Sequence, residues 1–161
     1  MRFLADSMLG TLAKWLRILG YDTTYYAHLD DNEALRLARA ERRILLTRDT
    51  GFRGRKGLRY LLIESEVLEE QIVQVLQAFD LRPDKEFSRC PVCNVPIEEV
   101  PKHEAWGQVP PFIFQTHEHL SLCPECSRFY WRGTHWQRML DTVKRLSRSE
   151  ARPLAPRDAV L

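Results

Sequence analysis

The sequence predicts an α/β domain, with a parallel sheet flanked by helices, followed by a small module organised by cysteines. Two observations carry this prediction. Short apolar runs typical of strands alternate with amphipathic segments typical of helices over residues 1–80. Four cysteines then follow in two Cys-x-x-Cys pairs. A chain of 161 residues has room for one ordinary domain and one small appended unit.

The first domain is expected to span residues 1–80. Apolar and β-branched stretches predict four strands, at residues 3–5, 22–26, 43–47 and 58–63. Apolar residues at helical spacing predict three helices, at residues 9–19, 31–38 and 65–79. Gly20 ends the first helix, and Asp30 with Glu33 forms a capping box that opens the second. The third helix begins at Ser65, with acids in its first turn.

The second half of the chain divides differently. Residues 80–88 predict a linker, and residues 89–146 predict the cysteine module with a last helix that begins at the N-cap Thr134. The apolar side of that helix is marked by Trp136, Met139, Leu140 and Val143. Residues 147–161 contain two prolines and no periodicity, so we expect a disordered tail there.

The cysteines form two tight pairs, Cys90 with Cys93 and Cys123 with Cys126, and each pair encloses a proline. Two such pairs brought together in space form a tetrahedral zinc site. Two disulfides are the alternative, but the sequence carries no hallmark of an oxidising compartment. We therefore expect a structural zinc ion held by the four thiolates. The 29 residues between the pairs must then carry strands or a loop of their own.

Histidines in that intervening segment are alternative zinc ligands. They are His103, His117 and His119. With four thiolates present, we expect none of them to replace a sulfur. His135 is expected to brace the zinc site by hydrogen bonding.

Acidic residues follow the predicted strands. Asp6 comes directly after the first strand, Asp49 follows the third, and Asp30, Asp31 and Glu33 follow the second. Because the carboxyl ends of parallel strands meet at one edge of the sheet, these carboxylates are expected to converge. Converging carboxylates repel each other unless a cation neutralises them, and oxygen ligands favour Mg²⁺ or Mn²⁺. Helix capping is the alternative role; it suits Asp30 and Glu33 best and leaves Asp31 as the better ligand candidate.

Charge is distributed in blocks of one sign, although the net charge is only +2. Residues 36–59 contain nine Arg or Lys against two acids, a local balance of +7. Residues 64–86 are acidic, and the chain turns basic again after the second cysteine pair. The blocks favour a cationic surface for phosphate backbones, with solvated helix faces as the alternative. Beside such a surface, a metal site suits the hydrolysis of phosphodiesters, since metal ions activate water and hold the leaving oxygen.

Several stretches are distinctive in combination. They read FLADSMLG at residues 3–10, LAKWLRILGYD at 12–22, RILLTRD at 43–49 and, beside the cysteines, YWRGTH at 130–135. These stretches resemble the PIN-type ribonuclease family known from the Mut-seven C-terminal domain, and the resemblance covers about residues 1–140. It implies a PIN-like α/β domain joined to a zinc ribbon, and metal-dependent cleavage of RNA.

The resemblance also implies roles for individual residues. Asp6, Asp31 and Asp49 match the acids that hold Mg²⁺ or Mn²⁺ and carry catalysis, and Thr47 would help to position the last of them. Arg48 would contact a phosphate. On their charge alone, the other residues expected to contact RNA are Lys14, Arg17, Arg53, Arg55 and Lys56. One departure is that residues 50–52 hold no fourth acid, which PIN nucleases usually place soon after the third.

Two other classes of function stay open. The missing acid favours a non-catalytic RNA-binding or ribosome-associated adaptor of the same fold, and the ribbon alone is compatible with a protein-interaction module. The absence of a Gly-x-Gly-x-x-Gly or P-loop motif disfavours dinucleotide and P-loop chemistry. The tryptophans are expected to pack in the core rather than to stack on bases; they are Trp15, Trp106, Trp131 and Trp136.

The sequence contains no apolar run that approaches the roughly 18 residues needed to cross a bilayer. An acid at position 6 also comes too early for the apolar part of a secretory signal. We therefore expect a cytoplasmic protein with RNA as its partner and no association with membranes.

Overall fold

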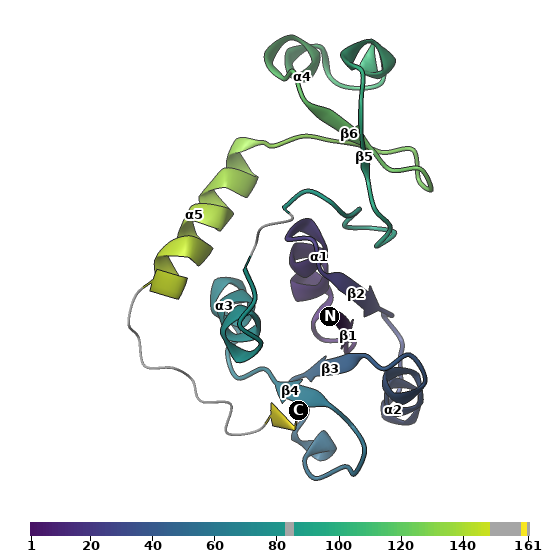
Figure 1. The fold of residues 1–161 in the computed structure, drawn as a ribbon, viewed down its shortest axis with the longest axis vertical. Coiled ribbons are helices and arrows are strands. Elements are labelled where there is room, and N and C mark those ends of the chain that lie inside the picture. Colours follow the sequence, from purple (N-terminus) through teal and green to yellow (C-terminus); the bar gives the residue numbers. More distant parts are fainter. Residues whose placement is uncertain (83–85, 149–158, 161) are drawn as a thin grey trace.

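A parallel sheet lies at the centre of the first part of the chain (Figure 1). The computed structural model describes residues 1–82, 86–148 and 159–160. Four parallel strands run in the order β2-β1-β3-β4: β1 (Arg2–Ala5), β2 (Asp22–Tyr25), β3 (Ile44–Thr47) and β4 (Tyr60–Leu62). A short strand, β8 (Ala159–Val160), pairs antiparallel with β4. The predicted α/β class with a four-stranded parallel sheet is confirmed.

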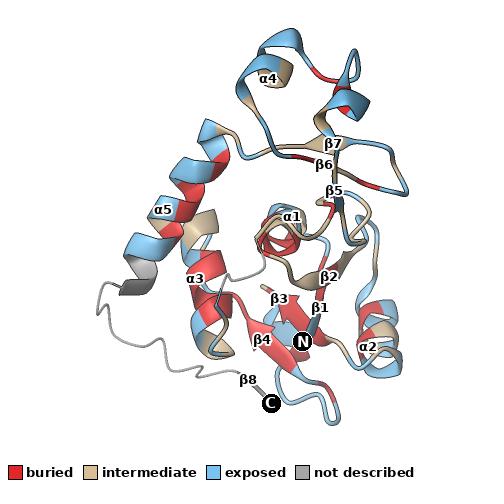
Figure 2. Cartoon of the chain, turned by 45° about the horizontal axis from the view of Figure 1, so that its top comes forward, coloured by how far each residue is buried: buried red, intermediate tan, exposed pale blue. Residues whose placement is uncertain are grey.

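Helices cover both faces of this sheet (Figures 1 and 2). Side chains alternate along each strand, so Phe3 and Ala5 enter a core with α1 (Gly10–Ile18) and α3 (Leu68–Ala78), while Leu4 packs toward α2 (Asp31–Ala40) on the other face. Burial on both faces explains why β1, β3 and β4 read as largely continuous apolar runs rather than as an alternating pattern.

The capping box predicted for α2 is present. The Asp30 carboxylate accepts a hydrogen bond from the backbone N–H of Glu33 at 2.9 Å, and the Glu33 carboxylate accepts one from the N–H of Asp30 at 3.3 Å. In contrast, α3 begins at Leu68, three residues later than predicted. Ser65 explains the difference, because its hydroxyl accepts from the N–H of Val67 and so stabilises a turn ahead of the helix.

The last helix, α5 (Thr134–Arg148), packs against α3 and belongs to the core of the α/β domain. Among the side chains described in this helix, the buried ones are the four apolar residues named above, Trp136, Met139, Leu140 and Val143. The grouping of this helix with the cysteine module as residues 89–146 stays a prediction. Most of the tail expected to be disordered, and residues 83–85 of the expected linker, lie outside the described residues.

The cysteine module contains a three-stranded antiparallel sheet in the order β5-β6-β7. Its strands are β5 (Glu98–Val100), β6 (Leu120–Leu122) and β7 (Phe129–Tyr130). Between β5 and β6, a 3-10 turn, η2 (Lys102–Ala105), and α4 (Pro111–Thr116) close over a small core. The expectation that this segment carries strands of its own is therefore confirmed. Within the described part of the chain, no helix is long and apolar enough to span a bilayer.

Candidate functional site

The strand order creates a topological switch point between β1 and β3. From β1 the chain passes through α1 on one face to β2, and from β2 it returns through α2 on the opposite face to β3, on the other side of β1. The connections that leave β1 and β3 therefore diverge. In open α/β sheets, ligands bind outside the carboxyl ends of the strands at such a point. Asp6 directly follows β1, and Asp49 lies two residues after β3.

Thr47 joins these two strand ends through hydrogen bonds. Its hydroxyl donates to Oδ2 of Asp6 at 2.5 Å and accepts from the backbone N–H of Asp49 at 2.9 Å. Asp6 is buried and also accepts from two backbone N–H groups, that of Met8 at 2.9 Å and that of Arg48 at 3.1 Å. The Asp6 carboxylate is thus held in one orientation at the carboxyl edge of the sheet, and Thr47 links it to the backbone of Asp49.

Asp49 and Asp31 are more exposed than Asp6. Asp49 caps the short 3-10 helix η1 (Thr50–Phe52) and accepts from the N–H of Gly51 at 2.8 Å. Asp31 is the first residue of α2 and follows β2 at the same edge of the sheet. Among the described residues, only the cysteines bring three or more metal-ligating atoms within 4.8 Å of one another. The three aspartates therefore share an edge without forming a closed cluster.

A loop after β4 adds acidic residues to this edge that our reading of the sequence missed. Glu64 and Glu66 are exposed just beyond the strand, and Glu66 accepts from the guanidinium of Arg48 at 2.7 Å. Gln74 fixes the start of this loop, since it accepts from the N–H of Glu64 and donates to the carbonyl of Leu62. The signal was present in the sequence: an acid follows a predicted strand, as it does at Asp6 and Asp49.

The residues predicted to contact RNA fall into three environments. Lys14 is exposed on α1, and Arg53, Arg55 and Lys56 are exposed on the turn that leads from η1 to β4. Arg48 is partly buried and is ion-paired with Glu66.

Arg17 lies in the third environment, in the interior. It is 7% exposed, its Nε donates to the carbonyl of Thr23 at 2.7 Å, and its Nη1 donates to the carbonyls of Pro91 at 2.8 Å and Val92 at 3.0 Å. The predicted RNA contact of Arg17 is contradicted, because a buried guanidinium bound to three carbonyls is not presented to a ligand. Instead, Arg17 connects α1 and β2 to the turn between Cys90 and Cys93.

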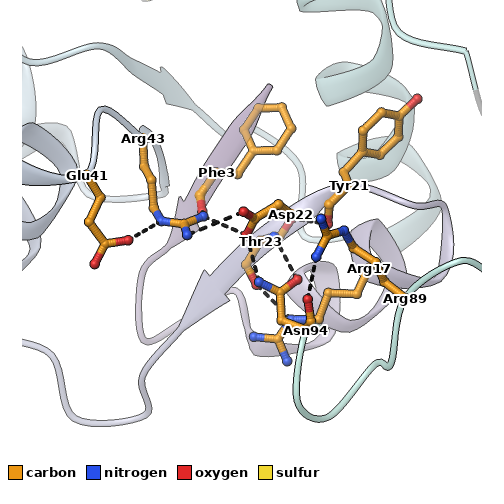
Figure 3. Close-up of polar contacts among 9 residues, drawn as sticks. All are labelled: Phe3, Arg17, Tyr21, Asp22, Thr23, Glu41, Arg43, Arg89 and Asn94. Atoms are coloured by element: carbon orange, nitrogen blue, oxygen red, sulfur yellow. Dashed lines mark hydrogen bonds and ion pairs between the residues drawn. The ribbon is translucent and has the colours of Figure 1, made fainter. Parts of the chain in front are cut away.

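Asn94 makes the second connection between the cysteine module and the sheet (Figure 3). It lies directly after Cys93 with a φ of 66°, a backbone conformation that asparagine tolerates. Its side chain accepts from the N–H of Thr23 at 3.1 Å and donates to Asp22 at 2.7 Å. The cysteine module therefore provides a hydrogen-bond acceptor for the backbone of β2, which lies at the end of the sheet.

Asp22 lies at the centre of this network, between Asn94 and Arg43 (Figure 3). Burial by itself raises the pKa of Asp22, but hydrogen bonds from Arg43, at 2.7 Å, and from Asn94 outweigh it and lower the pKa below its usual value. Arg43 also donates to Glu41 at 2.6 Å. This arginine, one of the nine in the basic block, serves the sheet rather than a phosphate surface.

The four cysteines form a compact cluster. Their sulfur atoms all lie within 4.8 Å of one another, with Cys90 and Cys123 buried. The two turns match: Asn94 donates to the carbonyl of Cys90 and Ser127 donates to that of Cys123, both at 2.9 Å, and both donors have positive φ. Four sulfurs on two equivalent turns are the donor set of a closed zinc site. None of the three histidines between the pairs joins this cluster of described residues.

Hydrogen bonds prepare one cysteine of the cluster for ionisation. Burial opposes the thiolate of Cys90, but N–H groups of Cys93 and Val92 and the hydroxyl of Tyr130, 3.1 Å from the sulfur, lower its pKa to about 7. Burial and the neighbouring sulfurs raise the pKa of Cys93 to about 12. Four crowded sulfurs resist full ionisation unless a cation is present, which fits zinc. Tyr130 takes the bracing role expected of His135, which is exposed on α5.

We compared the chain with known proteins to find the family to which it belongs. A search of curated proteins and a search of solved structures found no match. The model of the Mut7-C RNAse domain family matches residues 1–143, which include the sheet, the cysteine module and most of α5. The chain therefore belongs to the Mut7-C RNAse domain family, whose name implies a ribonuclease acting on RNA.

Proposed function

We propose that this protein is a metal-dependent ribonuclease that hydrolyses RNA phosphodiester bonds. The reaction would take place at the carboxyl edge of the sheet, where Asp6 and Asp49 lie. One observation carries the proposal: these two acids follow adjacent parallel strands at the switch point and are linked through Thr47. A buried carboxylate fixed at such a point, as that of Asp6 is, is typical of a ligand site rather than of surface charge. Membership of the Mut7-C RNAse domain family supports the same reaction class.

Asp6, Asp31 and Asp49 are the proposed ligands of Mg²⁺ or Mn²⁺. Ionised carboxylates offer about four lone-pair sites each, so the three hydrogen bonds to Asp6 leave capacity for a cation. When bound, such an ion supplies a Lewis acid that polarises a phosphoryl oxygen and lowers the pKa of water. Because the three acids do not form a closed cluster, Asp31 is the ligand that we expect to contribute least to affinity.

The remaining residues at this edge hold the acids and attract the substrate. Thr47 orients Asp6, and Glu66 holds the side chain of Arg48 beside the same edge. Lys14, on α1, and the exposed basic turn at residues 53–56 would neutralise phosphates of the bound strand. We therefore expect binding to weaken steeply as the salt concentration rises.

We further propose that the four cysteines hold one structural zinc ion. The matching turns that begin at Cys90 and Cys123 and the lowered pKa of Cys90 support this assignment. All four positions of a tetrahedral site are then filled by protein sulfur, which leaves none for a substrate. The metal would therefore contribute to folding and not to the reaction.

A non-catalytic RNA-binding adaptor is the second candidate. It is favoured by the open arrangement of the three aspartates and by the lack of an acid at residues 50–52. An adaptor would keep the salt-dependent affinity for RNA and lack turnover.

RNA cleavage in Mn²⁺ by purified wild type, Asp6→Asn and Asp49→Asn separates these candidates. We expect each substitution to lower the rate by roughly 100-fold or more while RNA affinity is retained, since Asn keeps the shape but not the charge. Asp30→Asn is the matched control, because it keeps a good N-cap on α2 and should cleave like wild type. If wild type and all three variants bind RNA yet leave it equally intact, the adaptor is the correct function.

A further inference from the structure

An aromatic cavity of about 360 Å³ lies where the cysteine module meets α1 and α5. Its volume falls within the roughly 300–1,000 Å³ typical of small-molecule sites. Rings from four parts of the chain line it, namely Trp15, Phe87, Phe129, Tyr130, Trp131, His135 and Trp136. Such a concentration of π faces favours a flat aromatic ligand over an aliphatic one.

The charges around this cavity favour an anionic ligand. Arg89 lines it, and no carboxylate of the described residues does. Just outside, the guanidinium of Arg132 lies over the rings of Phe87, at 6.0 Å, and Trp136, at 5.5 Å. A cation stacked on the cavity's own wall can meet a phosphate attached to a ring held inside.

A larger neighbouring hollow of about 670 Å³ differs in charge. It shares Phe87, Ile97, Tyr130 and Trp131 with the aromatic cavity, and Arg132 lines it together with Glu86, Glu99 and Glu118. These carboxylates repel a phosphate backbone, so we expect RNA to meet this hollow at Arg132 and not to extend along it.

We propose that the aromatic cavity binds one unpaired base of a single-stranded RNA, whose phosphate is met by Arg132. This inference rests on the proposed function. Single-stranded RNA is recognised by bases that stack on aromatic rings and on arginine planes, and this cavity provides both.

The position of the cavity along α1 is compatible with one RNA strand reaching both sites. Trp15 lies five residues after Gly10, about 7 Å along the helix, and α1 begins four residues after Asp6. Lys14 is exposed on the same helix. An RNA strand that reached from the acid edge to the rings could therefore contact a cation on α1.

Trp131 is the wall residue best suited to a test. Trp15 and Trp136 are 8% and 6% exposed and belong to the main core, so their replacement would destabilise the fold. Trp131 is only partly buried. Trp106 offers a matched control, since it is 74% exposed on the same module and does not line the cavity.

The experiment measures the affinity of zinc-loaded variants for a short single-stranded RNA, without added Mg²⁺ or Mn²⁺, and for the same backbone lacking bases. We expect Trp131→Ala to weaken binding of the normal RNA about tenfold, Trp131→Phe to restore most of it, and Trp106→Ala to change nothing. The oligonucleotide without bases should bind wild type and Trp131→Ala equally.

Zinc content and thermal unfolding check that each variant is folded. If Trp131→Ala loses zinc, Arg132→Met and His135→Ala replace it, since both side chains are exposed, and each should weaken binding of the normal RNA. Unchanged affinity in the folded variants, with cleavage intact, overturns the base site and leaves the proposed function standing. A wild type that does not bind RNA at low salt overturns both.

Discussion

Thr47 is fully buried, and its hydroxyl is the only atom shown to bond both Asp6 and the backbone of Asp49 within the described residues. We expect Thr47→Val, which keeps the shape, to leave the Asp49 N–H unpaired and to lower the free energy of unfolding by about 1–3 kcal/mol. The Asp6 carboxylate also loses its shortest contact, so kcat for RNA cleavage should fall roughly tenfold or more.

Thr47→Ser is the conservative control, because it keeps the hydroxyl. Steady-state cleavage kinetics and urea unfolding would be measured for both variants. A loss of stability in Thr47→Val without any loss of kcat would mean that Thr47 serves the sheet and not the acids.

Asp22 gives the stability of the protein a dependence on pH. The folded state holds its pKa below the unfolded value of 3.8, mainly through Arg43 and Asn94 acting against burial. A lowered pKa stabilises the fold above the unfolded pKa, and this contribution is lost as the pH falls through the folded value. We expect Asp22→Asn to be less stable than wild type at neutral pH and to lose less stability on acidification.

Urea unfolding from about pH 7 down to about pH 3 checks this expectation. Glu98→Gln is a suitable control, since Glu98 is an exposed acid of β5 outside the network. If the free energy of unfolding falls with pH equally for wild type and Asp22→Asn over the acid range, the assigned role of the network is contradicted.

Two elements, α1 and the turn between Cys90 and Cys93, are joined by Arg17. Methionine at this position would fill the space but leave the carbonyls of Thr23, Pro91 and Val92 without their donor. We expect Arg17→Met to lower the free energy of unfolding by about 2–3 kcal/mol. It should also speed the release of zinc to a chelator, because the turn that carries the thiolates loses its support.

Lys14→Met is the matched control on the exposed side of the same helix. It should unfold and release zinc like wild type, although RNA affinity should drop modestly. If Arg17→Met and wild type release zinc at equal rates, the hydrogen bonds of Arg17 do not stabilise the zinc site.

Local sequence patterns predicted most elements because their causes are local. The capping box of α2 and the apolar strand runs needed only neighbouring residues, and both are confirmed. Parallel strands then put Asp6 and Asp49 at one edge, as predicted from strand order in the chain. The role of Arg17 was not predictable in this way, since its partners lie 74 and 75 residues away in another module.

Other differences have similar causes. The late start of α3 depends on which group the Ser65 hydroxyl bonds, and a helix pattern does not specify that choice. The amphipathic pattern of α5 predicted a buried face but not the surface that buries it, which is α3 rather than the cysteine module.

At the scale of the whole molecule, α5 and residues 86–94 tie the cysteine module to the α/β core. Phe87 donates from its backbone to the carbonyl of Ile18 at 2.7 Å and packs its ring on Trp136, and Asn94 bonds the edge strand β2. Zinc at the four thiolates should therefore stabilise both parts. We expect its removal by a chelator to lower the melting temperature of the entire chain in a single transition.

Hydrogen exchange localises this effect. Without zinc, the amide of Thr23 should exchange faster, because its partner Asn94 lies on the metal-binding turn, whereas amides in β3 at the centre of the sheet should change less. Two separate melting transitions, or protection of Thr23 that does not depend on zinc, would contradict the coupling.

Anomalous diffraction from crystals soaked in Mn²⁺ tests the proposed acid edge most directly. The zinc proposed at the four cysteines would provide an internal control in the same crystal. The result that we predict is a manganese peak within bonding distance of carboxylate oxygens of both Asp6 and Asp49. A filled zinc site with no manganese at this edge would contradict metal-dependent cleavage there.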